Sequence, residues 1–381
     1  MITSPKTRVA IVVSRLTIGG AEQVLLEMLR HINRQRFDLH IFFLRDPGPL
    51  GKEILHLGFP INTRIIRYKY DMLGVFKLAG LFQDFQADVV FLNNHLNALF
   101  FGVLAAKLSG VRACINWEHE TFRKYPFHHL TMLGRRILHL GIDYVVAVAK
   151  GHGDYIATEE HVPRSKIRVI YNGVDPKRFQ SSLSPLEARR RLGISPQCPV
   201  VSILAALRPD KAHHVFLHAA RMTVAAIPET HFLLIGDGPQ MPYLKALTKD
   251  LNLEKQVHFL GFQRQLGDIM AAVDVNCLSS YPQQETLSVA AIEAMSAGIP
   301  IVCTNVGSMN EIVIPNETGF LVPADDPGSL SEKIIHILKD VDHKQYMSYN
   351  CRRLVNDMLS VHHMARSFED LFHLSIAGSI N

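Results

Sequence analysis

Two carboxylates, Glu285 and Glu293, stand eight residues apart around the start of a predicted helix. If that helix opens near Thr286, a rise of about 1.5 Å per residue separates them by roughly 12 Å along its axis. Carboxylates that share one glycosidic bond in a hydrolase lie about 5 to 9.5 Å apart, so the wider spacing suits a ligand held at two ends. We therefore predict a nucleotide-sugar site, with the hexose at one carboxylate and the ribose at the other.

The diphosphate of this ligand would lie between the carboxylates, beside the backbone amides of Thr286, Leu287 and Ser288. Amides in the first turn of a helix lack partners within the helix and attract anions. The alternative is that Glu285 only complements the helix dipole and Glu293 is solvated. The apolar neighbours of Glu293 favour a ligand, because an unpaired charge is costly to bury there.

Cationic side chains, Arg208 and Lys211, follow the first predicted strand of the second half of the chain. Cations at this place would stabilise a departing diphosphate, although an ordinary basic loop would look similar. Gly236 opens the sequence Gly-Asp-Gly-Pro after the next strand, which predicts a tight loop beside the nucleotide.

A glycine pair, Gly19 and Gly20, follows the first predicted strand of the chain and opens a helix. Paired glycines let the backbone approach a phosphate or sugar closely. The fingerprint Gly-x-Gly-x-x-Gly is absent here, which argues against a dehydrogenase.

Short apolar runs alternate with amphipathic helical stretches in both halves, a pattern typical of βαβ units and parallel sheets. We predict an α/β fold of two Rossmann-like domains facing across a cleft, since open parallel sheets bind ligands beyond the carboxyl ends of their strands. The predicted strands are 9–14, 39–44, 61–67, 89–92, 113–117 and 144–148, then 200–205, 231–235, 257–260, 273–277, 299–303 and 319–322.

The length of 381 residues also favours two domains. The Asn-Gly turn at Asn172 and the polar segment 180–185 place the boundary between an acceptor-binding domain, 1–175, and a nucleotide-sugar-binding domain, 176–360. The remaining residues, 361–381, form a predicted helix that would return to the first domain.

The composition describes an ordinary globular protein, with 48% hydrophobic and 20% charged residues. No apolar run reaches the roughly 18 residues of a membrane span, and the first apolar run is too short for a signal peptide, so we expect a cytoplasmic protein. The five cysteines are scattered, which predicts free thiols and no zinc site. We expect no nucleic-acid partner.

The basic charge belongs to the first half: residues 1–175 hold 22 Lys and Arg against 15 Asp and Glu, and the remainder holds 18 against 20. Arg123, Lys124, Arg135 and Arg136 alternate with apolar residues, which predicts either a contact with an anionic membrane or a solvated helix face.

The ordered set of motifs closely resembles the retaining nucleotide-sugar glycosyltransferases of the GT-B fold, in glycosyltransferase family four, also called glycosyl transferases group 1. The resemblance covers nearly the whole chain. It depends on Gly19-Gly20-Ala21-Glu22, Tyr171-Asn172-Gly173-Val174-Asp175, Lys211, Gly236-Asp237-Gly238-Pro239, Glu285 with Glu293, and the segment 316–323.

The resemblance implies a role for each matching residue. Glu285 would bind hydroxyls of the donor sugar, Glu293 the ribose, and Lys211 the diphosphate. Gly20 would offer its amide to the diphosphate. His119, which follows a predicted strand, matches the family's first-domain histidine near the sugar; with Lys211 and Glu285 it completes the predicted catalytic set.

The sequence departs from the family pattern at two places. The family usually has Arg five residues before the lysine, where this chain has Ala206, and Arg208 is the candidate substitute. The family also follows the first glutamate with Gly-Phe-Gly, where this chain has Thr286, Leu287 and Ser288. Backbone amides serve equally in both versions, whereas sugar preference can differ.

The implied reaction retains the anomeric configuration and needs no cofactor or divalent metal, because Lys211, helix amides and Arg208 would stabilise the leaving diphosphate. The resemblance implies transfer of a hexose or N-acetylhexosamine, with UDP favoured over GDP. A glycan or lipid-linked acceptor at the inner membrane face would suit the basic first domain, as in cell-surface polysaccharide synthesis. The alternatives are an epimerase or phosphorylase of the same fold, and an inactive scaffold that binds sugar nucleotides.

Overall fold

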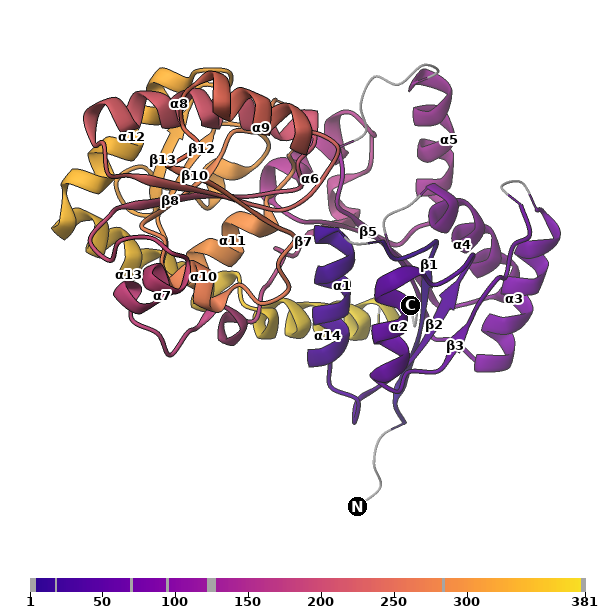
Figure 1. The fold of residues 1–381 in the computed structure, drawn as a ribbon. Coiled ribbons are helices and arrows are strands. Elements are labelled where there is room, and N and C mark those ends of the chain that lie inside the picture. The colour runs from indigo at the N-terminus through magenta and orange to yellow at the C-terminus, as the bar shows by residue number, and fades with distance from the viewer. Residues whose placement is uncertain are drawn as a thin grey trace. The chain divides into compact units, whose positions relative to one another are not determined.

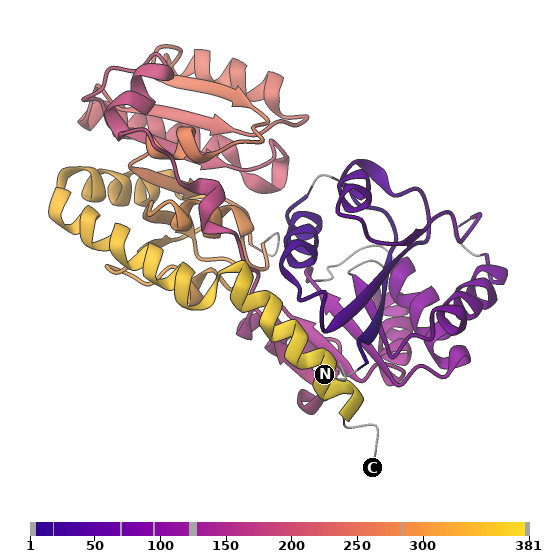
Figure 2. The same cartoon turned by 90° about the horizontal axis from the view of Figure 1, so that it is seen from below.

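The computed structural model describes residues 5–17, 19–68, 71–93, 96–121, 128–282 and 285–377, without the side chains of 128–131. The chain forms two compact units: Met1–Gly173 together with Val361–Asn381, here called unit 1, and Val174–Ser360, called unit 2. In each unit the strands are layered between helices (Figures 1 and 2). The residues 122–127 of the proposed basic patch, and Ile18 before the glycine pair, lie outside the described residues.

Unit 1 is built on a seven-stranded sheet in which all registered neighbours are parallel. Its central strands are buried on both faces, as near-continuous apolar runs require. The strand order is β3-β2-β1-β4-β5-β6-β7. The bounds are β1 Thr7–Val13, β2 Phe37–Phe43, β3 Ile61–Asn62, β4 Val89–Asn93, β5 Ala113–Glu118, β6 Tyr144–Ala147 and β7 Ile167–Val169.

The helices of unit 1 cover both faces of this sheet (Figure 1). The final helix packs its aromatic face on β4, where Phe368 and Phe372 make edge contacts with Phe91. Glu369 also accepts a hydrogen bond from the amide of Asn33 at 2.8 Å. The bounds are α1 Gly20–His31, α2 Gly48–His56, α3 Leu73–Phe85, α4 Leu96–Ser109, α5 His128–Leu140, α6 Lys150–Thr158, η1 Arg164–Lys166 and α14 Val361–Ala377.

Unit 2 holds a six-stranded sheet whose paired strands are all parallel, in the order β10-β9-β8-β11-β12-β13. The strands are β8 Val200–Leu204, β9 His231–Ile235, β10 Val257–Gly261, β11 Val275–Leu278, β12 Ile301–Thr304 and β13 Gly319–Val322. The helices are η2 Pro176–Phe179, α7 Pro185–Arg191, η3 Pro209–Lys211, α8 His213–Ala226, α9 Met241–Asp250, α10 Gly267–Ala271, α11 Val289–Ser296, η4 Met309–Glu311, α12 Pro327–Lys339 and α13 Val341–Met358.

The two parallel sheets confirm the predicted α/β class. The predicted strand 61–67 was too long: only Ile61–Asn62 pairs, because Arg64 adopts a left-handed conformation (φ 53°) that breaks the extended run. The short edge strand β7 corresponds to a strand that was expected to end at the Asn-Gly turn of Asn172, and it ends slightly earlier, at Val169. Among the described residues no helix is both long and apolar enough to cross a membrane.

Candidate active site

A lysine and a carboxylate meet where the strand order of unit 2 reverses, between β8 and β11. Lys211 ends η3 after β8, and its Nζ lies 2.5 Å from Oε2 of Glu285, in the segment after β11. Both side chains are largely buried, at 15% and 11% exposure. Ser280 Oγ donates to the same oxygen at 3.1 Å. Open α/β sheets bind ligands at such a reversal, so the pair occupies the expected position for a ligand site.

Backbone contacts between the loops after β8 and β11 hold Lys211 in place. Ser279 Oγ donates to the carbonyl oxygens of Lys211 and Ala212 at 2.9 and 3.0 Å. The amide of Tyr281 donates to the carbonyl of Asp210 at 3.0 Å. These serines and the tyrosine were not predicted from sequence; the only signal was a Ser-Ser-Tyr run at the end of an apolar strand.

The segment before α11 differs from the prediction in one respect. The helix begins at Val289, whereas a start near Thr286 was predicted. The Ser288 hydroxyl accepts a hydrogen bond from the amide of Ala291 at 3.4 Å. Ser288 is a strong N-cap residue, which explains the later start. The axial spacing of roughly 12 Å that assumed helix from Thr286 to Glu293 is therefore not applicable.

The amides that were predicted to receive an anion nevertheless precede this helix directly. Those of Thr286, Leu287 and Ser288 make no hydrogen bond with any residue that the structure describes. Glu293 lies half-buried on the second turn of α11. Unsatisfied amides at a helix entrance are suited to a phosphate.

Gly307 shapes the backbone of this segment and was not singled out from the sequence. It has a left-handed φ of 57°, and a Cβ there would overlap the carbonyl oxygen of Glu285 and lie 2.7 Å from that of Thr286. The neighbouring Ser308 amide donates to the Thr286 carbonyl at 2.7 Å. The loop after β12 therefore clamps the chain on which Glu285 is carried, and only glycine fits.

Gly236 brings the loop after β9 against the loop that carries Lys211. Its φ is 143°, and an added Cβ would overlap the carbonyl oxygen of Ala205. Leu207 donates its amide to the carbonyl of Asp237 at 3.0 Å. This predicted site residue thus lies next to the lysine loop, in keeping with its predicted role in shaping a pocket.

Arg208 is not part of the Lys211–Glu285 pair. Its Nη2 lies 2.9 Å from Oδ2 of Asp210, and its side chain is 55% exposed. One carboxylate therefore already balances its charge. The nearby His213 is buried, and burial, followed by the charge of Lys211, lowers its pKa to about 4, so this histidine is neutral at physiological pH.

The candidate residues of unit 1 follow β1 and β5. Gly19 caps α1 in an extended conformation, and Gly20 is the first helical residue. A Cβ on Gly19 would lie 2.5 Å from Oε2 of the buried Glu22, so a larger residue there would require that carboxylate to shift. His119 follows β5, is 8% exposed, and lies against Trp117 with ring centroids 4.2 Å apart.

A buried charge network lies directly before His119. Arg135 Nη2 is 2.6 Å from Oε1 of Glu118 and 2.7 Å from Oε2 of Glu160, and all three side chains are at most 3% exposed. His139 Nε2 lies 3.9 and 3.8 Å from the same oxygens. Arg135 was predicted to belong to a basic surface patch; it is instead buried, because its guanidinium is the counter-ion of both carboxylates.

The network also has the residue types of a metal site, since Glu118, His139 and Glu160 offer atoms within 4.8 Å of one another. The guanidinium already supplies the cation there. Burial alone would raise the pKa of Glu118, but the charge of Arg135, then His139, outweighs it and holds that pKa well below its usual range. Burial and then the charge of Glu118 raise the pKa of Glu160.

The comparisons with known proteins identify the family of this chain. The model of the family described as "Glycosyltransferase Family 4" matches residues 18–178, and that of "Glycosyl transferases group 1" matches residues 186–354. The chain is 24% identical to the Escherichia coli UDP-Gal:alpha-D-GlcNAc-diphosphoundecaprenol alpha-1,3-galactosyltransferase, with 97% of each chain covered. It is also 24% identical to the N-acetyl-alpha-D-glucosaminyl L-malate synthase of Bacillus anthracis, with 94% of each covered.

Among solved structures, Anabaena Alr3699/HepE in complex with UDP superimposes with a TM-score of 0.85 at 22% identity, covering 97% of this chain and 100% of that one. This likeness shows the fold, which is the GT-B fold of two parallel α/β units. The two family matches together take in most of the chain, in the order of its two sheets. The chain therefore belongs to the family four, or group 1, glycosyltransferases of the GT-B fold.

Proposed function

We propose that this glycosyltransferase moves a hexose or N-acetylhexosamine from a UDP-sugar to a hydroxyl of a glycan or lipid-linked acceptor, with retention of the anomeric configuration. The observation that carries the proposal is the Lys211–Glu285 pair beside three unsatisfied amides at the sheet reversal of unit 2. A phosphate that reaches the amides can take Lys211 as counter-ion, which leaves the Glu285 carboxylate to accept sugar hydroxyls.

In the proposed reaction the bond from the anomeric carbon to the diphosphate oxygen breaks, and a bond to the acceptor oxygen forms on the same face. The acceptor's proton passes to the departing diphosphate, so no nucleophile of the protein takes part. Lys211 and the amides of 286–288 stabilise the charge that develops on the leaving group. We assign Glu293 to the ribose, Gly20 to the diphosphate and His119 to the sugar, as in the family pattern.

The UDP preference has support from the comparisons. The E. coli relative is named for UDP-galactose, and the Anabaena structure is a complex with UDP. The same E. coli relative is named for a diphosphoundecaprenol acceptor, which favours a lipid-linked acceptor and a role in cell-surface polysaccharide synthesis.

We expect transfer without a divalent cation. Metal-bridged transferases hold the metal through an Asp-x-Asp sequence, and the single one in this chain, Asp340-Val341-Asp342, opens α13, where Asp340 accepts the amide of His343 at 2.9 Å as a helix cap. Purified protein, a panel of UDP- and GDP-sugars and a lipid-diphosphate acceptor, assayed with and without EDTA, should give equal rates in both conditions. Activity lost in EDTA and restored by manganese would contradict the proposal.

A membrane contact is proposed for α5. Leu133, Ile137 and Leu140 follow each other at helical spacing and are 54%, 60% and 80% exposed. Such a stripe suits a lipid surface, with Arg136 beside it. We propose on this basis a location at the inner face of the cytoplasmic membrane.

The contact is testable with vesicles. Cosedimentation should be stronger with vesicles that contain anionic lipid than with neutral vesicles, and Ile137→Asp should reduce it several-fold, because each exposed apolar residue contributes about 1 kcal/mol on insertion. The matched control is Leu186→Asp in unit 2, where the leucine is 40% exposed. Binding that is independent of the anionic lipid, or equally weakened in both variants, would exclude this surface.

A further inference from the structure

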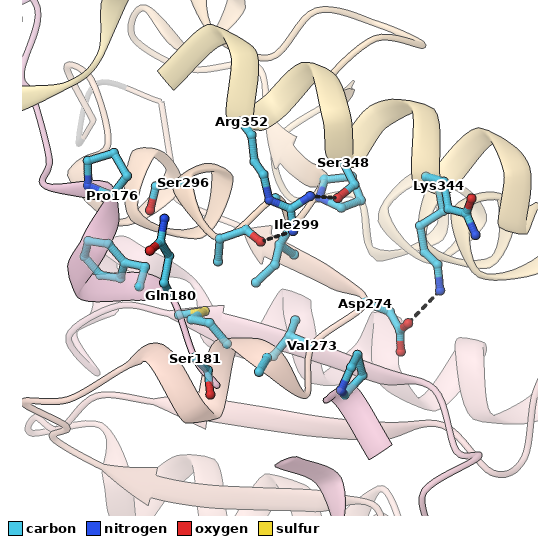
Figure 3. A pocket seen from close by; sticks show the side chains of 18 of the residues that line it. Pro176, Gln180, Ser181, Val273, Asp274, Ser296, Ile299, Lys344, Ser348 and Arg352 are labelled. Atoms are coloured by element: carbon cyan, nitrogen blue, oxygen red, sulfur yellow. Dashed lines mark hydrogen bonds and ion pairs between the residues drawn. The ribbon is translucent and has the colours of Figure 1, made fainter. Parts of the chain in front are cut away.

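Unit 2 contains a hollow of about 400 Å³ at the amino-terminal end of its strands, whereas Lys211 and Glu285 lie beyond the carboxyl ends. Val273 and Asp274, in its wall, directly precede β11, and Ile299 and Pro300 directly precede β12 (Figure 3). The candidate donor residues instead follow the carboxyl ends of the strands. The volume is within the range of about 300 to 1,000 Å³ that small-molecule sites occupy.

The walls of the hollow are rich in neutral hydrogen-bonding groups. Amides and hydroxyls come from three separate elements: the segment that continues from η2, the end of α11, and α13. Amide side chains both donate and accept, as do hydroxyls, which is what a ligand with several hydroxyl groups requires. These polar lining residues are Gln180, Ser181, Ser296, Gln345, Ser348 and Asn356. The hydroxyls of Ser181 and Ser296 already donate to Asp268 and to the carbonyl of Glu293, at 2.6 and 2.7 Å, so the three side-chain amides are the main groups open to a ligand.

The hollow also carries more positive than negative charge. Asp274 is satisfied at both oxygens: Lys344 Nζ lies 2.6 Å from Oδ1, and Arg189 Nη2 lies 2.6 Å from Oδ2. Arg352 has only neutral partners, the hydroxyl of Ser348 and the carbonyl of Ala297, each at 2.8 Å. No carboxylate within the described parts of the chain forms an ion pair with it. The guanidinium of Arg352, an exposed residue, is thus solvated and has no counter-ion among the described residues, so it can pair with an anionic ligand.

A glycine leaves room for this guanidinium. Gly298 follows the end of α11 with a left-handed φ of 81°, and a Cβ there would overlap the Cζ of Arg352. Capping the helix explains the bond to Ala297, since cations stabilise helix C-termini. The bonds to Ser348 and Ala297 each use one N–H, from Nη1 and Nη2 respectively, and they do not explain the polar hollow beside the guanidinium. The remaining N–H groups of a fixed planar fork suit a carboxylate or phosphate.

We propose that this hollow binds a carbohydrate that carries one anionic group, either a sugar phosphate or a uronic acid. Arg352 pairs with the anion, and the side-chain amides of Gln180, Gln345 and Asn356 bind the sugar hydroxyls. The site is separate from the proposed transferase site and does not depend on the identity of its donor or acceptor.

The proposal is tested by titration calorimetry on the full chain with glucose 6-phosphate and glucuronic acid, and with glucose and inorganic phosphate as component probes. At least one anionic sugar should bind more tightly than either component, and excess UDP should not displace it. Arg352→Gln should weaken this binding about tenfold, which is about 1.4 kcal/mol, because the anion loses a charge-assisted hydrogen bond. Arg353→Gln removes the same charge one residue along α13, outside the lining, and should leave binding unchanged.

Gln180→Ala provides a second variant. Gln180 is exposed and follows the last residue of η2, and its side chain forms no hydrogen bond with any residue that the structure describes. It should weaken binding of the anionic sugar and leave that of inorganic phosphate unchanged. The proposal is overturned if neither anionic sugar binds, if phosphate alone binds as tightly, if UDP displaces the sugar, or if the Arg352 and Arg353 variants bind alike.

Discussion

Glu285→Gln is expected to lower kcat by about 10² to 10³-fold while UDP still binds, an effect of the size seen when one preorganised polar group is removed from an active site. The substitution keeps the shape of the side chain and removes its charge. Lys211 then loses the carboxylate 2.5 Å away that orients its ammonium group. The donor sugar loses the charged oxygen that accepts hydrogen bonds from its hydroxyls. The measurement is a steady-state transfer assay with the preferred UDP-sugar, together with UDP affinity by calorimetry.

The control for this variant is Glu332→Gln on α12, a glutamate that is 70% exposed and far along the chain from the proposed site. It should have wild-type kcat. Parallel loss of UDP affinity and kcat in Glu285→Gln would mean that the carboxylate supports nucleotide binding in general. Retention of more than about a tenth of the activity would remove Glu285 from the proposed catalytic set.

Lys211→Met tests the same pair from the other side. Both single variants leave one charge of a largely buried pair without its counter-charge, so their effects on stability should not add in the double variant. This coupling distinguishes the pair from two residues that act independently.

Much of the fold was predictable because parallel strands are buried on both faces and appear as apolar runs. β8 and β9 of unit 2 are of this kind. Apolar runs did not define the strand bounds where burial is partial: β7 has two half-buried residues and one exposed residue, and β3 keeps only two paired residues. Strand order and the reversal between β8 and β11 come from tertiary pairing, which sequence periodicity does not encode.

The candidate site was predictable in its residue types and not in its contacts. The acidic and basic residues around Glu285 and Lys211 could be identified from their spacing, and their direct ion pair could not, because 74 residues separate them in sequence. Gly307 and Ser279 act through backbone carbonyls, so nothing in their residue type identifies their role. Arg135 was assigned to the surface because its apolar neighbours resembled an amphipathic face, and only the fold brings Glu118 and Glu160 to it.

Arg135→Met is expected to lower the free energy of unfolding by about 3–5 kcal/mol, the range for breaking a buried ion pair from one side. The variant keeps most of the side-chain volume and leaves Glu118 and Glu160 together in the interior without their cation. Urea denaturation followed by circular dichroism gives the change. Arg136→Met is the matched control, since among the described residues the Arg136 guanidinium donates to the backbone carbonyl of the exposed Glu159 and to no carboxylate, and the variant should cost less than about 1 kcal/mol.

Glu160→Gln should have little effect on stability, unlike Arg135→Met, because the network holds two carboxylates and one guanidinium. Burial together with the charge of Glu118 already raises the pKa of Glu160. Removing this charge leaves a one-to-one pair, so stability should change by less than about 1 kcal/mol. The double variant Arg135→Met with Glu160→Gln should then be more stable than Arg135→Met alone, since it buries one carboxylate fewer. If the double variant is the less stable of the two, the network is held by shape and hydrogen bonding rather than by charge balance.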